Sequence, residues 1–373
     1  MRNRSSLSHP KIATILAATL IGAAMVGLSG PATASEHREA PLNLASLQAS
    51  GVRSFGAPVL GAAQPASSVS QGVSPAMAND DQMAEPAWQG SFATPSGRAT
   101  VTNPILYHTG GALYAGNVAI YPVWVGTWSA TRKTLWNKVL SNLVTALGTA
   151  TSNTATANQV FATNQTYFTS RALVAPTLLW PQATTPTASI SATGNVTDAQ
   201  VAGYLSTALQ QNLVPSPTTS NGNQPIYLYL GANNTYLSSG FGTKYCGWHS
   251  WGTIGTTKIT YIAIQDFTSN YLSACSAQTK ASPNGDLYVD AMASVLVHEI
   301  DETLTDPFLN AWYDAKGAEN ADKCAWTFGT TTSLSGYSYN YTAGSLKYLI
   351  QRNWLSNNVA KADGTSCVLA SAS

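Results

Sequence analysis

Charged residues are scarce in this sequence: they make up 9% of its 373 positions, and the formal net charge at pH 7 is +1. Proteins that bind nucleic acid or anionic membrane surfaces recruit clustered lysine and arginine. We therefore expect neither kind of partner. Long apolar runs are also missing beyond the N-terminal segment, and none approaches the roughly 18 residues that a transmembrane helix needs. The sequence thus predicts no membrane-embedded domain.

Three common catalytic signatures are absent: the GxSxG nucleophile elbow, the Walker phosphate loop and the GxGxxG dinucleotide fingerprint. Their absence argues against the enzyme classes that depend on them. The tryptophan-rich pieces WVGTW and CGWHSW would suit a carbohydrate groove. Aromatic core packing is the commoner explanation for such pieces.

The N-terminus has the pattern of an export signal. Arg2, Arg4 and Lys11 precede an apolar run, and small residues at 32–34 supply a cleavage pattern. Consecutive arginines are absent, which favours the general export route. A signal peptide is therefore predicted at 1–34, and the protein is expected outside the cell or in a periplasm.

The rest of the chain divides into two parts by composition. Residues 35–98 are rich in Ala, Ser, Pro, Gly and Gln and show no sustained periodicity, which is typical of a disordered linker or a pro-segment. Residues 99–373 have the length and apolar content of one large globular domain.

Only four cysteines are present, Cys246, Cys275, Cys324 and Cys367. Behind an export signal, two disulfides are expected rather than free thiols. Sequence permits three pairings, and we favour the two local ones, the first cysteine with the second and the third with the fourth. A four-cysteine zinc cluster is disfavoured because the chain has no CxxC pair.

Strand-like and helix-like segments alternate along the globular part. Their apolar spacing and their caps predict an α/β fold, a single domain with a mixed sheet and flanking helices. Strands are predicted at 117–126, 225–231 and 258–266, and helices at 129–147, 197–213, 283–307 and 343–355.

Acidic residues concentrate in one short region. Seven of the 17 acids lie between positions 298 and 322, and His298 opens a nine-residue stretch that holds four carboxylates. This stretch lies in the second half of the helix predicted at 283–307. The first half of that helix, AMASVLV, is apolar nearly all round and must be buried, so the acidic half is expected to be buried as well. Buried carboxylates need protons, bases or a metal ion.

The spacing of this stretch resembles the HExxH zinc motif, with glutamate in place of the second histidine. His298 and Glu302 lie four residues apart on one helix face, and Asp306 continues the row. In such motifs the intervening glutamate, here Glu299, is the general base that activates metal-bound water. The alternative is a solvated helix end, with His298 hydrogen-bonded in the core.

Several residues compete for the remaining ligand positions: Glu319, Asp322, His249 and Asp306. His249 is also a candidate catalytic residue, as a donor to a developing oxyanion, and His108 is a weaker candidate ligand. Zinc is the first choice of metal because an imidazole is present, although an oxygen-rich set also suits calcium or manganese.

Seven ordered motifs follow one another along the globular part: YHTGGALYAGNVAIYPVWVG, CGWH, PNGD, VDAMASVLVHE, DPFLNAWY, ENADKC and YLIQRNW. At these motifs the sequence resembles the EXORDIUM family, also called phosphate-induced protein 1, and in particular its bacterial secreted members. The resemblance implies a cell-wall or matrix association, a link to growth promotion and a zincin-like helix. It maps family positions onto His249, His298, Glu299, Glu302, Glu319 and Asp322, and it favours Glu319 or Asp322 over Asp306.

Two functions are therefore expected from the sequence. The first is a secreted zinc hydrolase of peptidase type and zincin-like fold, in which His298, Glu302 and Glu319 bind the metal and Glu299 is the base. It would act on an extracellular peptide, protein or cell-wall substrate. The second is a non-catalytic extracellular growth or adhesion factor in which the same cluster holds a structural metal ion.

Overall fold

The computed structural model describes residues 104–148, 162–182, 188–218, 220, 222–254, 257–356 and 367–369. The predicted signal peptide (1–34) and linker (35–98) lie outside these residues, so both stay predictions. The chain divides into the units Met1–Ala40 and Pro41–Ser373, and every described residue belongs to the second. Within the described part, no helix is both long enough and apolar enough to cross a membrane.

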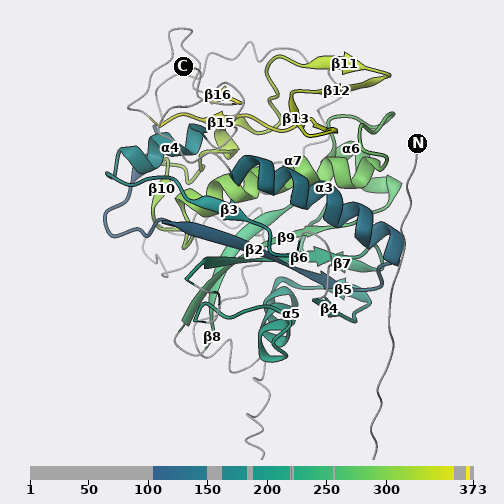
Figure 1. The fold of residues 1–373 in the computed structure, drawn as a ribbon, viewed down its shortest axis with the longest axis horizontal. Coiled ribbons are helices and arrows are strands. Elements are labelled where there is room, and N and C mark those ends of the chain that lie inside the picture. The colour runs from purple at the N-terminus through teal and green to yellow at the C-terminus, as the bar shows by residue number, and fades with distance from the viewer. Residues whose placement is uncertain are drawn as a thin grey trace, which may run out of the picture. The chain divides into compact units, whose positions relative to one another are not determined.

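A six-stranded sheet forms the centre of the described part (Figure 1). In spatial order its strands are β3 (Thr177–Leu179), β2 (Asn117–Val125), β6 (Gln224–Gly231), β9 (Thr257–Gln265) and β8 (Trp248–Ile254), with β4 (Ser189–Ile190) also paired to β2. Five of the strands run parallel, and β8 pairs antiparallel with β9. The sheet is therefore mixed, as the sequence predicts.

Helices cover both faces of the sheet. α3 (Ala130–Gly148) and α7 (Leu287–Thr305) lie together on one face, and α5 (Asp198–Gln210) packs against β2 and β6 on the other (Figure 1). Strands covered on both faces need nearly continuous apolar sequence, and eight of the nine residues of β2 are buried. This burial explains why the central strands can be predicted from their apolar runs.

Small elements surround this core. They are β1 (Leu106–Tyr107), α4 (Ala162–Thr169), β5 (Gly194–Val196), β7 (Thr235–Leu237), η2 (Ser269–Tyr271), α6 (Leu272–Cys275), β10 (Trp312–Tyr313), η3 (Asp322–Cys324), β11 (Thr332–Leu334), β12 (Tyr337–Tyr339), β13 (Tyr341–Ala343), β14 (Leu346–Tyr348), β15 (Asn353–Trp354) and β16 (Cys367–Val368).

Both predicted disulfides are present. Cys246 bonds Cys275, and Cys324 bonds Cys367, each with 5.5 Å between the Cα atoms. The first joins the residue two places before β8 to the end of α6, and the second joins η3 to β16. Loops of this size stabilise a fold by about 3–4 kcal/mol each in the chain-entropy model.

The helix predicted at 343–355 is wrong. The segment instead contributes to an antiparallel hairpin of β13 and β14, followed by the short strand β15. Gly344 turns the hairpin with φ of +59°, a conformation that glycine adopts without strain. Apolar residues at three- and four-residue spacing therefore occur here without a helix.

Candidate metal centre

Helix α7 supplies three of the candidate residues from its second half. Asp286 caps its first turn by accepting hydrogen bonds from the amides of Tyr288 and Val289 at 2.9 and 3.0 Å. The helix packs against β9 and α3, so His298, Glu299 and Glu302 are buried together with its apolar half. This burial rules out the alternative of a solvated helix end.

Strand β8 supplies His249, whose side chain is completely buried. The strand approaches α7 closely because position 247 is glycine: a Cβ there would lie 2.5 Å from Val295 Cγ1 and 3.2 Å from Glu299 Oε1. Contacts this short would force the strand and the helix apart. The nearby disulfide at Cys246 fixes the same end of the strand.

The segment before Cys324 supplies Glu319 and Asp322. The amide of Glu319 donates to Asp322 Oδ2 at 2.9 Å, and the amide of Asp322 donates to Glu302 Oε1 at 3.0 Å. The second bond joins the segment directly to α7. Three separate pieces of chain therefore meet at one buried point.

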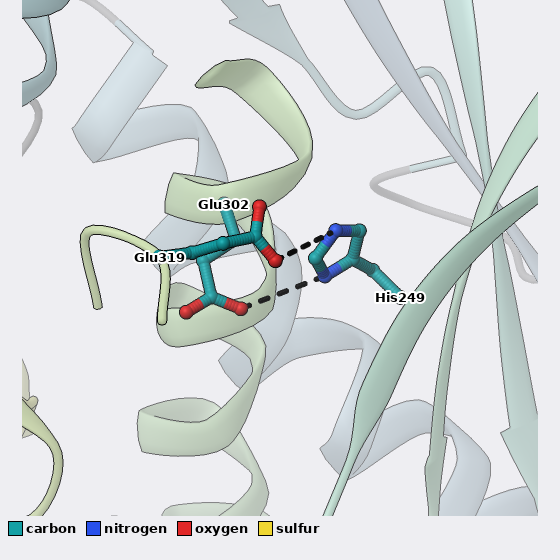
Figure 2. Close-up of side chains that lie close together, drawn as sticks. All are labelled: His249, Glu302 and Glu319. Carbon is teal, nitrogen blue, oxygen red and sulfur yellow. Dashed lines mark ion pairs between the residues drawn. The ribbon is translucent and has the colours of Figure 1, made fainter. Parts of the chain in front are cut away.

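The side chains form two groups, each with three potential metal ligands. The first group is His249, Glu302 and Glu319 (Figure 2), and the second is His298, Glu302 and Asp322. In each group the ligand atoms lie within 4.8 Å of one another. Glu302 belongs to both groups, so its carboxylate lies between the two imidazoles.

In the first group, His249 Nδ1 lies 3.5 Å from Glu302 Oε2, and its Nε2 lies 3.6 Å from Glu319 Oε2 (Figure 2). The same Nδ1 lies 3.4 Å from Glu299 Oε2. In the second group, His298 Nε2 lies 3.0 Å from Glu302 Oε1 and 3.6 Å from Asp322 Oδ1. The two oxygens of Glu302 therefore face different histidines.

Burial and neighbouring charge oppose each other at these groups. Burial would lower the pKa of His249, but Glu299 and Glu302 outweigh it and raise the pKa to about 9. Burial would raise the pKa of Glu302, but His298 and His249 outweigh it and lower the pKa to about 2. Burial raises the pKa of Glu299 above its usual value. With no ion bound, these pKa shifts favour a protonated His249 beside an ionised Glu302.

Asp306 lies beside the two groups but belongs to neither. It is the residue at the C-terminal end of α7, and its Oδ1 accepts hydrogen bonds from the amides of Asn310 and Ala311. Burial raises the pKa of Asp306 to about 7. His108 is outside the cluster, where its ring stacks on Tyr313 with 3.6 Å between centroids.

A network of buried asparagines, which the sequence reasoning missed, positions the cluster. Asn164 of α4 donates to Asp301 Oδ1 at 2.9 Å, and its own Oδ1 accepts from Asn320 at 2.9 Å and from Asn353 at 2.7 Å. Asn320 follows Glu319 directly. The asparagines of the ENADKC and YLIQRNW motifs were the available signal, although nothing in the sequence indicated their partner on α4.

The residues present suit a divalent cation. Buried charges in proteins are paired or coordinate metals, and imidazole with carboxylate is a donor set that zinc and manganese accept. Glu302 Oε2 and Asp322 Oδ1 are buried oxygens that make no hydrogen bond in the described part of the chain. An ion in either group would give such an oxygen a partner.

Fold and site together define a class: a disulfide-stabilised α/β protein with a buried cluster of histidines and carboxylates. Residues 105–354 match the phosphate-induced protein 1 conserved region, so the chain belongs to this family. It is 26% identical to Protein EXORDIUM-like 3 of Arabidopsis thaliana over 66% of this chain and 79% of that protein. Protein EXORDIUM-like 5 of the same plant is 22% identical, over 67% of this chain and 75% of its own length. No solved structure matches the chain significantly.

Tryptophans of the WVGTW and CGWHSW pieces pack into the fold. Trp124 and Trp248 are buried, and Trp128 packs edge-on against Trp124 and Trp136. Core packing therefore explains these pieces better than a carbohydrate groove.

Proposed function

We propose that this family member is an exported protein whose buried cluster of histidines and carboxylates binds a divalent metal ion. Zinc is the preferred ion, and the bound ion stabilises the fold. The supporting observation is the burial of six carboxylates around only two imidazoles. They are Glu299, Asp301, Glu302, Asp306, Glu319 and Asp322. Lys323, the nearest cation in sequence, pairs with Asp314 at 2.8 Å instead.

The ion would be held by His249, Glu302 and Glu319. The second group of potential ligands, which shares Glu302, adds His298 and Asp322. Such an ion would join β8, α7 and the segment before η3. The role outside the cell would then be one of binding, as in a growth or adhesion factor. Export is supported by the N-terminal pattern and by two disulfides, which persist in oxidising compartments.

The experiment is thermal unfolding of the chelator-treated protein with and without added zinc, manganese or calcium. At a hundredfold excess of metal over Kd, the unfolding temperature should rise by about 5–10 °C. Glu302→Gln should abolish the rise, whereas Asp290→Asn, at a half-buried carboxylate in the first turn of α7, should keep it. An unchanged unfolding temperature with every metal would refute the proposal.

A zincin-like hydrolase is the second candidate, and Glu299 favours it. Glu299 follows His298 in the HExxE pattern, and its buried Oε1 makes no hydrogen bond in the described residues. A bound divalent ion would lower the pKa of a water molecule beside it. Glu299 would accept the proton that this water molecule loses. Against this candidate, the side chains of the first group are completely buried, whereas a catalytic site keeps a position open to substrate.

Glu299→Gln separates the two candidates. In a hydrolase the change should abolish cleavage of a fluorescent casein while metal content and unfolding temperature stay nearly unchanged. With a structural ion, the wild-type protein should show no cleavage that depends on Glu299. A Glu299-dependent, metal-dependent cleavage activity would establish the hydrolase.

A further inference from the structure

We infer that the cluster is built for two metal ions bridged by Glu302. The inference rests on the proposed function and specifies it further: one ion would lie in the group of His249 and Glu319, and the second in the group of His298 and Asp322. Each group has its own imidazole and its own terminal carboxylate, and only Glu302 is shared.

The orientation of Glu302 is the first argument. Its Oε1 lies 3.0 Å from His298 Nε2, and its Oε2 lies 3.5 Å from His249 Nδ1. Each oxygen of one carboxylate therefore faces a different imidazole. Carboxylates in this arrangement bridge pairs of ions about 3.5–4 Å apart in two-metal sites.

The orientation of the two terminal carboxylates is the second argument. Glu319 Oε2 lies 3.6 Å from His249 Nε2, and Asp322 Oδ1 lies 3.6 Å from His298 Nε2. Each carboxylate thus lies beside a different histidine, although only two residues separate Glu319 from Asp322 in the sequence. A single ion would leave the more distant carboxylate and imidazole without a role.

Charge is the third argument. Metal-bound imidazoles are neutral, so the six buried carboxylates in and beside the two groups must be compensated by ions or protons. One divalent ion leaves four negative charges uncompensated, whereas two leave two. Two ions therefore require fewer added protons than one ion does.

The experiment is elemental analysis of the full chain, purified without a histidine tag, equilibrated with excess zinc and dialysed. We expect two zinc ions per chain in the wild type. Glu319→Gln and Asp322→Asn should each retain one, and Asp290→Asn, the matched control on α7, should retain two. Glu302→Gln should bind neither ion tightly.

Each result decides the question. One ion in the wild type would overturn the two-ion site but leave the proposed function standing, and no ion would refute both. Two ions retained in both single variants would place the ions elsewhere and also overturn the inference. As a second readout, electron paramagnetic resonance of the manganese-loaded wild type should show a spin-coupled pair, and each single variant should show an isolated ion.

Discussion

His249 is held between opposing electrostatic influences. Full burial disfavours its charge, yet the adjacent carboxylates raise the pKa of the ring to about 9. At neutral pH the metal-free ring therefore carries a proton on each nitrogen. A metal ligand must offer a free lone pair, so binding has to displace one of these protons.

Metal binding at His249 should consequently release about one proton at pH 7. Calorimetric titrations with zinc in two buffers of different ionisation enthalpy should give different apparent enthalpies. Because pH 7 lies below the raised pKa, the affinity should increase by up to about tenfold per pH unit between pH 6 and 8. An enthalpy independent of the buffer would show that His249 is not a ligand.

Gly247 sets the distance between β8 and α7. Gly247→Ala should cost about 1–3 kcal/mol of unfolding free energy, because the new methyl group overlaps Val295 Cγ1. It should also weaken metal binding, since His249 moves away from Glu302. Denaturant unfolding and zinc titration measure the two effects.

Gly285→Ala is the control for this prediction. Gly285 has φ of +93° and open space around it, so alanine there costs stability only through backbone strain. It should leave zinc affinity unchanged. Equal losses of affinity in both variants would contradict the role assigned to Gly247.

Among the elements, α4 stabilises a site to which it contributes no ligand. Its Asn164 contacts α7 through Asp301 and contacts the ligand-bearing segment through Asn320. Removal of the amide would leave several buried polar groups without partners, each costing about 1–3 kcal/mol. The helix therefore positions Glu319 relative to Glu302.

Asn164→Ala should lower the unfolding free energy by about 2–4 kcal/mol and reduce zinc affinity. Asn195→Ala, in β5 away from the cluster, should change neither quantity appreciably. Denaturant unfolding and zinc titration of the two variants check this. A stability loss in Asn164→Ala with unchanged zinc affinity would mean that the asparagine network does not position the ligands.

The long elements are predictable from sequence because burial on one or both faces imposes a pattern on them. The apolar runs of β2, β6 and β9 and the caps of α5 and α7 predict their positions to within a few residues. α4 and β8 were missed. The short sequence of α4 is largely polar, and β8 is an edge strand that mixes polar and aromatic residues.

At the scale of the whole molecule, a low overall content of charged residues contrasts with one local concentration of acidic residues. A chain with 9% charged residues places seven of its 17 acids near one helix end, and the described fold buries most of them. The sequence predicted that His298 and Glu302 lie on one helix face, because helical spacing fixes one relative to the other. It predicted a single ligand set of His298, Glu302 and Glu319, whereas the structure places Glu319 with His249 and Asp322 with His298. This division depends on tertiary contacts between distant segments, which the sequence does not show.

The most direct test of a metal centre is an anomalous difference map from crystals grown with zinc, measured on both sides of the zinc absorption edge. A peak about 2.0–2.2 Å from a nitrogen of His249 and from Glu302 would confirm it. Zinc-loaded crystals with well-ordered side chains and no peak among His249, His298 and Glu302 would contradict it.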